Sequence, residues 1–230
     1  GIIELSLNGV ESARKLTLKA ELGSCRNEWD VWVYPEQPKV EETNFIYTRI
    51  WNDKTKQWLD EGKSVLLIPE KCQGRKAHFA SHFWNPMIVG TLIDNEHPAF
   101  RDFPTGNYAD WQWWDILNYS TALELDELKE ITPLIQSIDS YETNQKLGIS
   151  FEANVGKGKL FVLCADPEKK IGERLAMQQL LTSVRNYVSS DRFKPERSLP
   201  VYQLDALFAP AAEEKSGNKG SKAIELLLNK

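Results

Sequence analysis

The residue types best suited to binding or transforming a ligand are concentrated between His97 and Asp115. Three of the eight tryptophans of the chain fall within four positions of this stretch: Trp111, Trp113 and Trp114. Their rings could stack on the apolar faces of sugar rings, but such rings also bury large areas in protein cores. Phe100 and Phe103 stand close by, which favours packing. The stretch therefore predicts either a packed loop or a carbohydrate-binding surface.

Carboxylates and one histidine accompany these aromatic residues. The acidic side chains of this region are Asp94, Glu96, Asp102, Asp110 and Asp115. A carboxylate pair can hydrolyse a glycosidic bond when its members lie about 5 to 9.5 Å apart, but no spacing singles out one pair here. No second ligand stands at metal-site spacing from His97, so a structural histidine is favoured and neither a metal nor another cofactor is predicted. Asp94 and His97 join the three tryptophans in the carbohydrate-binding hypothesis.

Two further motifs offer chemistry of other kinds. Cys72 follows a run expected to be a buried strand and could act as a nucleophile with His78 or His82. A reactive thiol needs a nearby base and an environment that favours the thiolate. No helical pattern follows Cys72, so an ordinary loop cysteine is favoured. The run 156–159, Gly-Lys-Gly-Lys, lacks the full phosphate-loop motif and precedes a strand, which favours a hairpin turn.

The composition excludes several classes of protein. The chain has 230 residues, a net charge of −5 and 41% hydrophobic residues, which suits a globular protein and disfavours nucleic acid as a partner. No apolar run reaches the ~20 residues of a membrane span. The three cysteines lie far apart, so no disulfide framework is expected. The first residues read as the inside of a strand, which suggests a fragment of a longer protein.

The hydrophobic pattern predicts the elements that position these residues. Alternation over 15–22 and 28–34 predicts two antiparallel strands. A strand over 45–50, a helix capped by Asn52 and ended by Gly62, and a buried strand over 64–68 together predict a βαβ unit. Further strands are expected over 87–93, 131–139, 147–153 and 160–165, with a short helix or turn over 111–117. A long amphipathic helix is expected over 171–189, and a closing strand over 201–208.

Several short motifs carry a resemblance to a known family. They are Asn27-Glu28-Trp29-Asp30-Val31-Trp32-Val33-Tyr34-Pro35, Phe83-Trp84-Asn85-Pro86, Gly90-Thr91-Leu92-Ile93-Asp94, His97-Pro98-Ala99-Phe100, Phe103-Pro104-Thr105, Trp111-Gln112-Trp113-Trp114 and Phe151-Glu152-Ala153 with Gly156-Lys157-Gly158-Lys159-Leu160. As a set they resemble the C-terminal region of large bacterial, Bacteroides-type glycoside hydrolase family 2 proteins, which are β-galactosidase-like. The resemblance covers about residues 27 to 195.

The resemblance implies an α/β fold, a flavodoxin-like or class I glutamine amidotransferase-like three-layer sandwich with an N-terminal antiparallel β segment. Residues 1–38 would end a β-sandwich module, residues 39–208 would form the α/β domain, and residues 209–230 would be a flexible tail. Active relatives of that fold carry a Gly-x-Cys-x-Gly elbow, which this chain lacks. The glycosidase carboxylates of the family lie in a barrel outside this segment. No catalytic residue is therefore carried over.

The leading hypothesis is a non-catalytic accessory or structural domain of a β-galactosidase-like glycoside hydrolase that acts in glycan degradation. The resemblance implies a periplasmic or secreted protein whose partners are the other modules of the same enzyme, with a glycan or a second copy as alternatives. Two other functions stay open. One is a carbohydrate-binding module that uses the tryptophan cluster at 111–114, and the other is a hydrolase or transferase that depends on Cys72.

Overall fold

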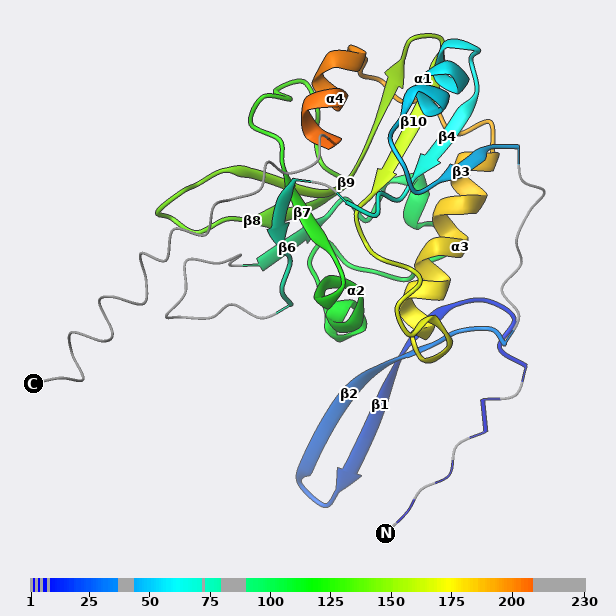
Figure 1. Ribbon diagram of the computed structural model, residues 1–230. Helices are drawn as coiled ribbons and strands as arrows, with labels where there is room; N and C mark the ends of the chain where they lie inside the picture. Colours follow the sequence, from blue (N-terminus) through cyan, green and yellow to red (C-terminus); the bar gives the residue numbers. More distant parts are fainter. Residues whose placement is uncertain are drawn as a thin grey trace, which may run out of the picture.

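The computed structural model describes residues 2, 4, 6, 7, 9–36, 44–71, 73–79 and 90–208. These residues form a mixed α/β body and a two-stranded hairpin that projects from it (Figure 1). The hairpin comprises β1 (Arg14–Leu22) and β2 (Cys25–Val33), paired antiparallel with Leu18 opposite Trp29. The alternation in the sequence predicted both strands, and this prediction is confirmed.

The expected βαβ unit is present at one edge of the main sheet. It consists of β3 (Ile46–Thr48), α1 (Asp53–Asp60) and β4 (Ser64–Leu67), and its two strands run parallel. The side chain of Asn52 caps α1 by accepting a hydrogen bond of 3.1 Å from the Thr55 N–H. Gly62 follows the helix with a φ of +83°, the left-handed conformation that glycine adopts most readily.

The main sheet has eight strands and is parallel only in part. Its main path runs β3-β4-β10-β9-β7-β5, while β8 pairs with β9 and β6 pairs with β8. The strands not yet defined are β5 (Gly74–Lys76), β6 (Gly90–Ile93), β7 (Thr121–Glu124), β8 (Ile135–Ile138), β9 (Lys146–Val155) and β10 (Gly158–Leu163). Only β3, β4 and β10 pair in parallel, and the other pairs are antiparallel. The α/β expectation is confirmed, but the sheet is mixed.

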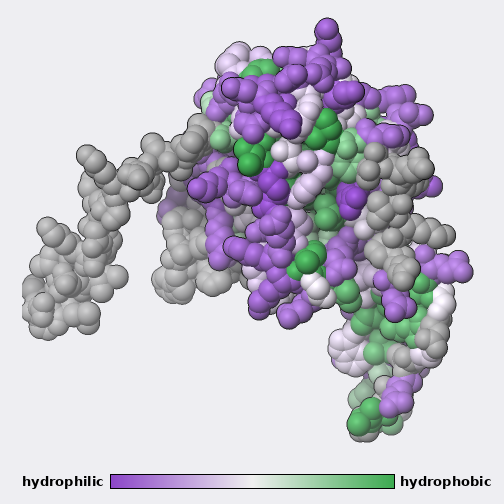
Figure 2. Space-filling view, turned by 45° about the vertical axis from the view of Figure 1, so that its right-hand side comes forward, coloured by the Kyte–Doolittle hydropathy of each residue, from purple (hydrophilic) through white to green (hydrophobic). Residues whose placement is uncertain are grey.

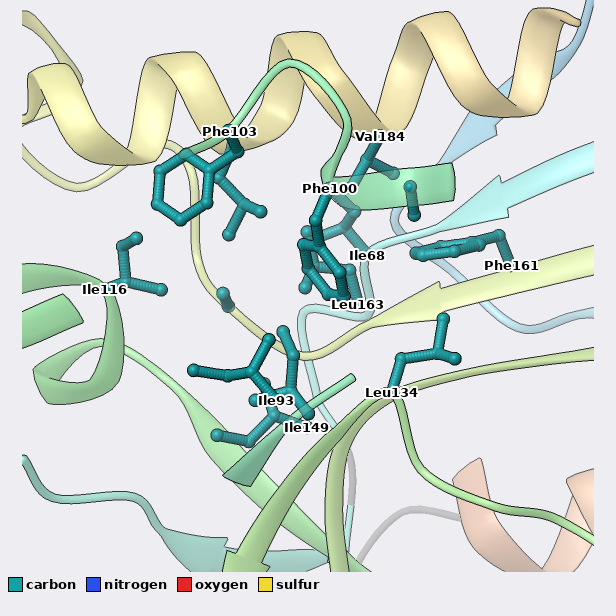
Figure 3. Packing of buried hydrophobic residues seen from close by; sticks show 14 of the residues in the cluster. Ile68, Ile93, Phe100, Phe103, Ile116, Leu134, Ile149, Phe161, Leu163 and Val184 are labelled. Atoms are coloured by element: carbon teal, nitrogen blue, oxygen red, sulfur yellow. The ribbon is translucent and has the colours of Figure 1, made fainter. Parts of the chain in front are cut away.

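Helices cover both faces of the central strands. The remaining helices are α2 (Trp114–Asn118), α3 (Leu175–Ser189) and α4 (Val201–Phe208), with short 3₁₀ turns η1 (Pro98–Phe100), η2 (Trp111–Trp113) and η3 (Ile171–Glu173). Alternate residues of β10 enter two different cores. Phe161 packs in the core beneath α3 (Figure 3), whereas Val162 packs in the core shared with α1 and α4. This two-sided burial explains why β4 and β10 are apolar on both faces.

One predicted element was of the wrong type. Residues 201–208 form the helix α4 rather than a closing strand. Leu204, Leu207 and Phe208 are buried at helical spacing, and this stripe packs on the α1 face of the sheet. Two short strands were also not expected, since β5 lies within a segment interpreted as a loop and β7 follows α2 directly.

Candidate functional site

The loop from His97 to Asp115 lies along helix α3 and is fastened to it by side-chain hydrogen bonds. The Ser183 hydroxyl donates to the Ala99 carbonyl at 2.7 Å and accepts from the Asp102 N–H at 3.0 Å. Asn186 donates to the Asp102 carboxylate at 3.0 Å. The loop is therefore held against the body at its first turn, with Phe100 and Phe103 directed into the core (Figure 3).

The three loop tryptophans have different environments. Trp113 is completely buried, and its ring makes edge-to-face contacts with Phe100 and Phe103 at centroid distances of 6.3 and 5.2 Å. Its indole N–H donates to Thr105 at 2.9 Å, so both the ring and its polar group are satisfied within the protein. Trp111 is 74% exposed and Trp114 is 54% exposed. Only these two could offer a ring face to a ligand.

Asp94 and His97 line a hollow of about 410 Å³ that contains none of the three tryptophans. Two residues outside the predicted set complete its polar floor, namely Glu152 from β9 and Tyr187 from α3. The Tyr187 hydroxyl donates to Glu152 at 2.9 Å, and the other carboxylate oxygen lies 3.7 Å from His97 Nε2. The carbohydrate-binding set predicted from the sequence is thus divided between two places.

The hydrogen bonds in this hollow favour binding over acid–base chemistry. The Ala99 N–H donates to His97 Nδ1 at 3.3 Å. A neutral imidazole therefore carries its proton on Nε2 and directs it at Glu152. Burial and the Glu152 carboxylate raise the pKa of Tyr187, which keeps the phenol protonated. The cluster therefore presents the His97 ring, the Tyr187 hydroxyl and the Glu152 carboxylate in fixed positions.

Charged residues from the segment after α3 form the rim of this hollow. They are Arg192, Lys194, Glu196 and Arg197. With Asp94 and Glu152 they give three cationic and three anionic groups around one opening, a pattern that suits a polar ligand with several hydroxyl groups. The sequence offered one weak signal for Glu152, a charged residue amid a buried strand. It offered none for Tyr187, which lies on the apolar stripe of α3.

The other predicted residues are dispersed. Burial raises the pKa of Asp115 although Arg174 opposes this effect, and the carboxylate lies 3.4 Å from the Arg174 guanidinium. Burial likewise raises the pKa of Asp110. Cys72 and His82 lie outside the described residues, and His78 is half-buried.

Within the described ranges, no group of three or more metal-ligating side chains is arranged to hold an ion. No helix of those ranges is long and apolar enough to cross a membrane.

The β1–β2 hairpin presents a second candidate surface, an apolar face that the body does not cover. On this face Leu16 stands opposite Val31 and Leu18 stands opposite Trp29. All four side chains are 39 to 47% exposed, and Leu22 near the tip is 84% exposed. Figure 2 shows the hairpin projecting from the body with hydrophobic residues at its surface. We refer to these five residues as the apolar hairpin face.

The opposite face of the hairpin is polar and internally paired. Lys19 lies 3.4 Å from Glu28, its direct partner across the two strands. Lys15 lies 2.8 Å from Asp30, which is diagonally opposite. Thr17 also donates a hydrogen bond to Asp30 at 3.0 Å. The two faces therefore differ in the way expected of a strand pair with one face in water and one face in a core.

Together these features define a mixed α/β domain preceded by an amphipathic β-hairpin. The chain belongs to the family described as domain of unknown function (DUF8487), whose model matches residues 46–209. Residues 1–35 match the model of a second family, described as domain of unknown function (DUF8488). No curated protein matches the chain. The hairpin and the α/β body thus match different family models.

Proposed function

We propose that this chain is a non-catalytic accessory module of a periplasmic or secreted, β-galactosidase-like glycoside hydrolase, and that it docks to a neighbouring module through the apolar hairpin face. The exposed face of β1 and β2 carries this proposal. A two-stranded hairpin is marginally stable alone, and strands with one apolar face normally pack on a second sheet about 10 Å away. The occupant that this chemistry fits is the apolar inner face of another antiparallel sheet.

We propose that the neighbour is a β-sandwich module of the same enzyme, as the sequence resemblance implies. The separate family match over residues 1–35 supports this assignment, because the hairpin and the α/β body match different models. We further propose that the body is a degenerate relative of the flavodoxin-like, glutamine amidotransferase-like fold. Its parallel strands β3, β4 and β10, with α1 and α3 on opposite faces, support that relation.

Amide hydrogen exchange tests the docking role. We expect fast exchange over residues 14–33 in the chain alone and slow exchange after fusion to a β-sandwich module of such a hydrolase. Leu18→Asp on the apolar hairpin face should abolish this protection, whereas Lys19→Ala on the polar face should leave it. Equal protection in the chain alone and in the fusion would overturn the docking proposal.

Hydrolysis assays test the non-catalytic role. The chain should release no product from a panel of aryl glycosides. Turnover that is lost in Asp94→Asn or Glu152→Gln, with the fold retained by circular dichroism, would show that the chain is an enzyme. Either variant leaves the size of the side chain almost unchanged, so a loss could be assigned to the carboxylate.

A second candidate function is carbohydrate binding at the His97 hollow. The observation that favours it is the fixed array of Asp94, His97, Glu152 and Tyr187 around an opening of about 410 Å³. Calorimetric titration with galactosides should give a binding heat. If this hollow binds them, His97→Ala should abolish that heat. If the exposed tryptophans bind them, Trp111→Ala should abolish the heat instead. No heat from any glycan would leave docking as the only role.

A further inference from the structure

A larger hollow, of about 630 Å³, opens where the three parallel strands end. Arg49 follows β3, residues 69–71 follow β4, and Cys164 follows β10, and all of them line this opening. In open α/β sheets, ligands bind in the crevice outside the carboxyl ends of parallel strands. This is therefore the position at which the fold itself places a binding site, and the His97 hollow is separate from it.

The loop tryptophans do not line this crevice. None of the three lines the hollow, because Trp113 enters the core beneath α3 instead. Residues 118–121, which run from the end of α2 to the start of β7, line the hollow instead. The Asp166 N–H donates to the Tyr119 carbonyl at 2.9 Å, which holds this wall against the end of β10. The opening is thus bordered by ordered segments, and the residues that the structure describes do not occupy it.

The hollow carries an excess of positive charge that the described residues do not neutralise. Arg49 is balanced, since its guanidinium lies 2.8 Å from Glu168 and 3.6 Å from Asp166. The other lining cations are Lys71, Lys76 and Lys169. In the described part of the chain, none of these three ammonium groups forms an ion pair. Glu70 is the one remaining carboxylate of the lining. Three cations thus face one anion in a chain whose net charge is −5.

Neutral hydrogen-bond donors line the same opening. Asn118, Tyr119 and Thr121 are among its lining residues. The Tyr119 ring is held in place by Arg174, whose guanidinium lies 4.5 Å from the ring centroid. Ammonium groups combined with hydroxyl and amide donors are the groups that bind oxyanions. A neutral sugar would leave the three lysines uncompensated, so an anionic ligand fits this hollow better than an uncharged one.

We propose that the hollow at the carboxyl ends of β3, β4 and β10 binds a small molecule through a tetrahedral oxyanion, a phosphate or a sulfate group, held by Lys71, Lys76 and Lys169. The site is independent of the apolar hairpin face and of the His97 hollow. A sugar phosphate and a sulfated sugar share this chemistry and differ in the central atom and the charge of the group.

The test is a ¹H–¹⁵N NMR titration of the whole chain with inorganic phosphate, in which chloride is exchanged to keep the ionic strength constant. We expect saturable shifts of the amides of residues 70, 71, 118–121, 164–166, 168 and 169. Each Lys→Ala change at positions 71, 76 and 169 should weaken binding about fivefold or more, since each removes one charge near the anion. Lys→Arg at the same positions should retain binding because the charge stays.

A matched control lies at the other end of the same strand. Lys157 is in the turn that precedes β10, so Lys157→Ala should leave the phosphate affinity unchanged. Parallel titrations with sulfate and with glucose 6-phosphate distinguish the sources. If the site accepts any tetrahedral oxyanion, both should compete with inorganic phosphate. If the site requires a phosphate group, sulfate should not compete. Linear shifts without saturation, or equal losses in Lys157→Ala, would show general screening and overturn the proposal.

Discussion

Strand β1 of the hairpin and strand β10 of the main sheet lie in opposite environments. Every residue of β1 is exposed, whereas Leu160 to Leu163 of β10 are all completely buried. Their sequence patterns also differ, since β1 alternates apolar with polar residues and has one apolar face, whereas residues 160–163 of β10 are all apolar and occupy both faces. The difference arises from their partners, since β10 has strands on both edges and helices on both faces, while β1 has β2 alone. Burial of the hairpin requires a partner from outside the α/β body.

The largest expected loss of unfolding free energy comes from truncating an apolar side chain of β10. Phe161 is completely buried and contacts the rings of Tyr187 and Phe193 at centroid distances of 6.0 and 6.3 Å. Phe161→Ala should lower the free energy of unfolding by about 3–5 kcal/mol, because it removes buried surface and leaves a cavity. Urea denaturation followed by circular dichroism measures this. A loss below about 1 kcal/mol would contradict the central position of β10 in the core.

The elements fixed by local chemistry were the ones predictable from the sequence. The cap at Asn52 and the glycine at position 62 bounded α1, and the alternation over residues 15–22 identified β1. These signals are local, since each depends on neighbours a few residues away. The pairing of β9 with β7 and β8 was not predictable, because it joins short strands separated by loops of no fixed length.

The candidate sites show the same division. The sequence indicated Asp94 and His97 because they stand near the aromatic loop, but their partners Glu152 and Tyr187 come from a strand and a helix far along the chain. The helix α4 was missed for a related reason. Eight residues with several large apolar side chains fit a strand or a helix equally well, and contacts with the α1 face decide between them.

A second comparison concerns two carboxylates whose pKa values are both lowered. Asp139 is almost fully buried. Burial alone would raise its pKa, but hydrogen bonds from the Gln145 N–H, the Thr143 hydroxyl and the Ser140 N–H, with the charge of Arg75, outweigh burial and lower it. Asp139→Asn should cost about 1.5–3 kcal/mol of unfolding free energy at pH 7, because hydrogen bonds to a charged group are lost.

The pH dependence of this cost has a definite sign. The pKa of Asp139 is lower in the folded chain than in the unfolded chain, so its contribution is complete above the unfolded pKa and is lost as the pH falls through the folded pKa. Urea titrations should show the difference between the wild-type chain and Asp139→Asn shrinking below about pH 4. Hydrogen bonds from Lys15 and Thr17 lower the pKa of Asp30 on the exposed hairpin, and Asp30→Asn should leave stability unchanged. Equal effects at both positions would contradict the comparison.

A third comparison uses two glycines, Gly158 at the start of β10 and Gly23 in the hairpin turn. A Cβ on Gly158 would lie 2.6 Å from the Lys63 carbonyl oxygen and 2.7 Å from that of Leu59, where the backbone cannot move easily. Gly158→Ala should therefore cost about 1–3 kcal/mol. Gly23, at the hairpin turn, has a φ of +59° and open space around it, so Gly23→Ala should strain only the hairpin. Gly158→Ala should lower the melting temperature of the body, whereas Gly23→Ala should leave it unchanged.

The smallest effect on the isolated chain is expected for the apolar hairpin face. Leu18 is 40% exposed and belongs to neither hydrophobic core cluster, so Leu18→Ala should change the unfolding free energy by less than about 0.5 kcal/mol. The same change in a fusion with the β-sandwich module should cost about 2–5 kcal/mol, the range for a leucine in a formed core. An equal small effect in both proteins would show that nothing covers this face. A large effect in the isolated chain would show that the face is already buried, because a truncation in water removes no packed contacts.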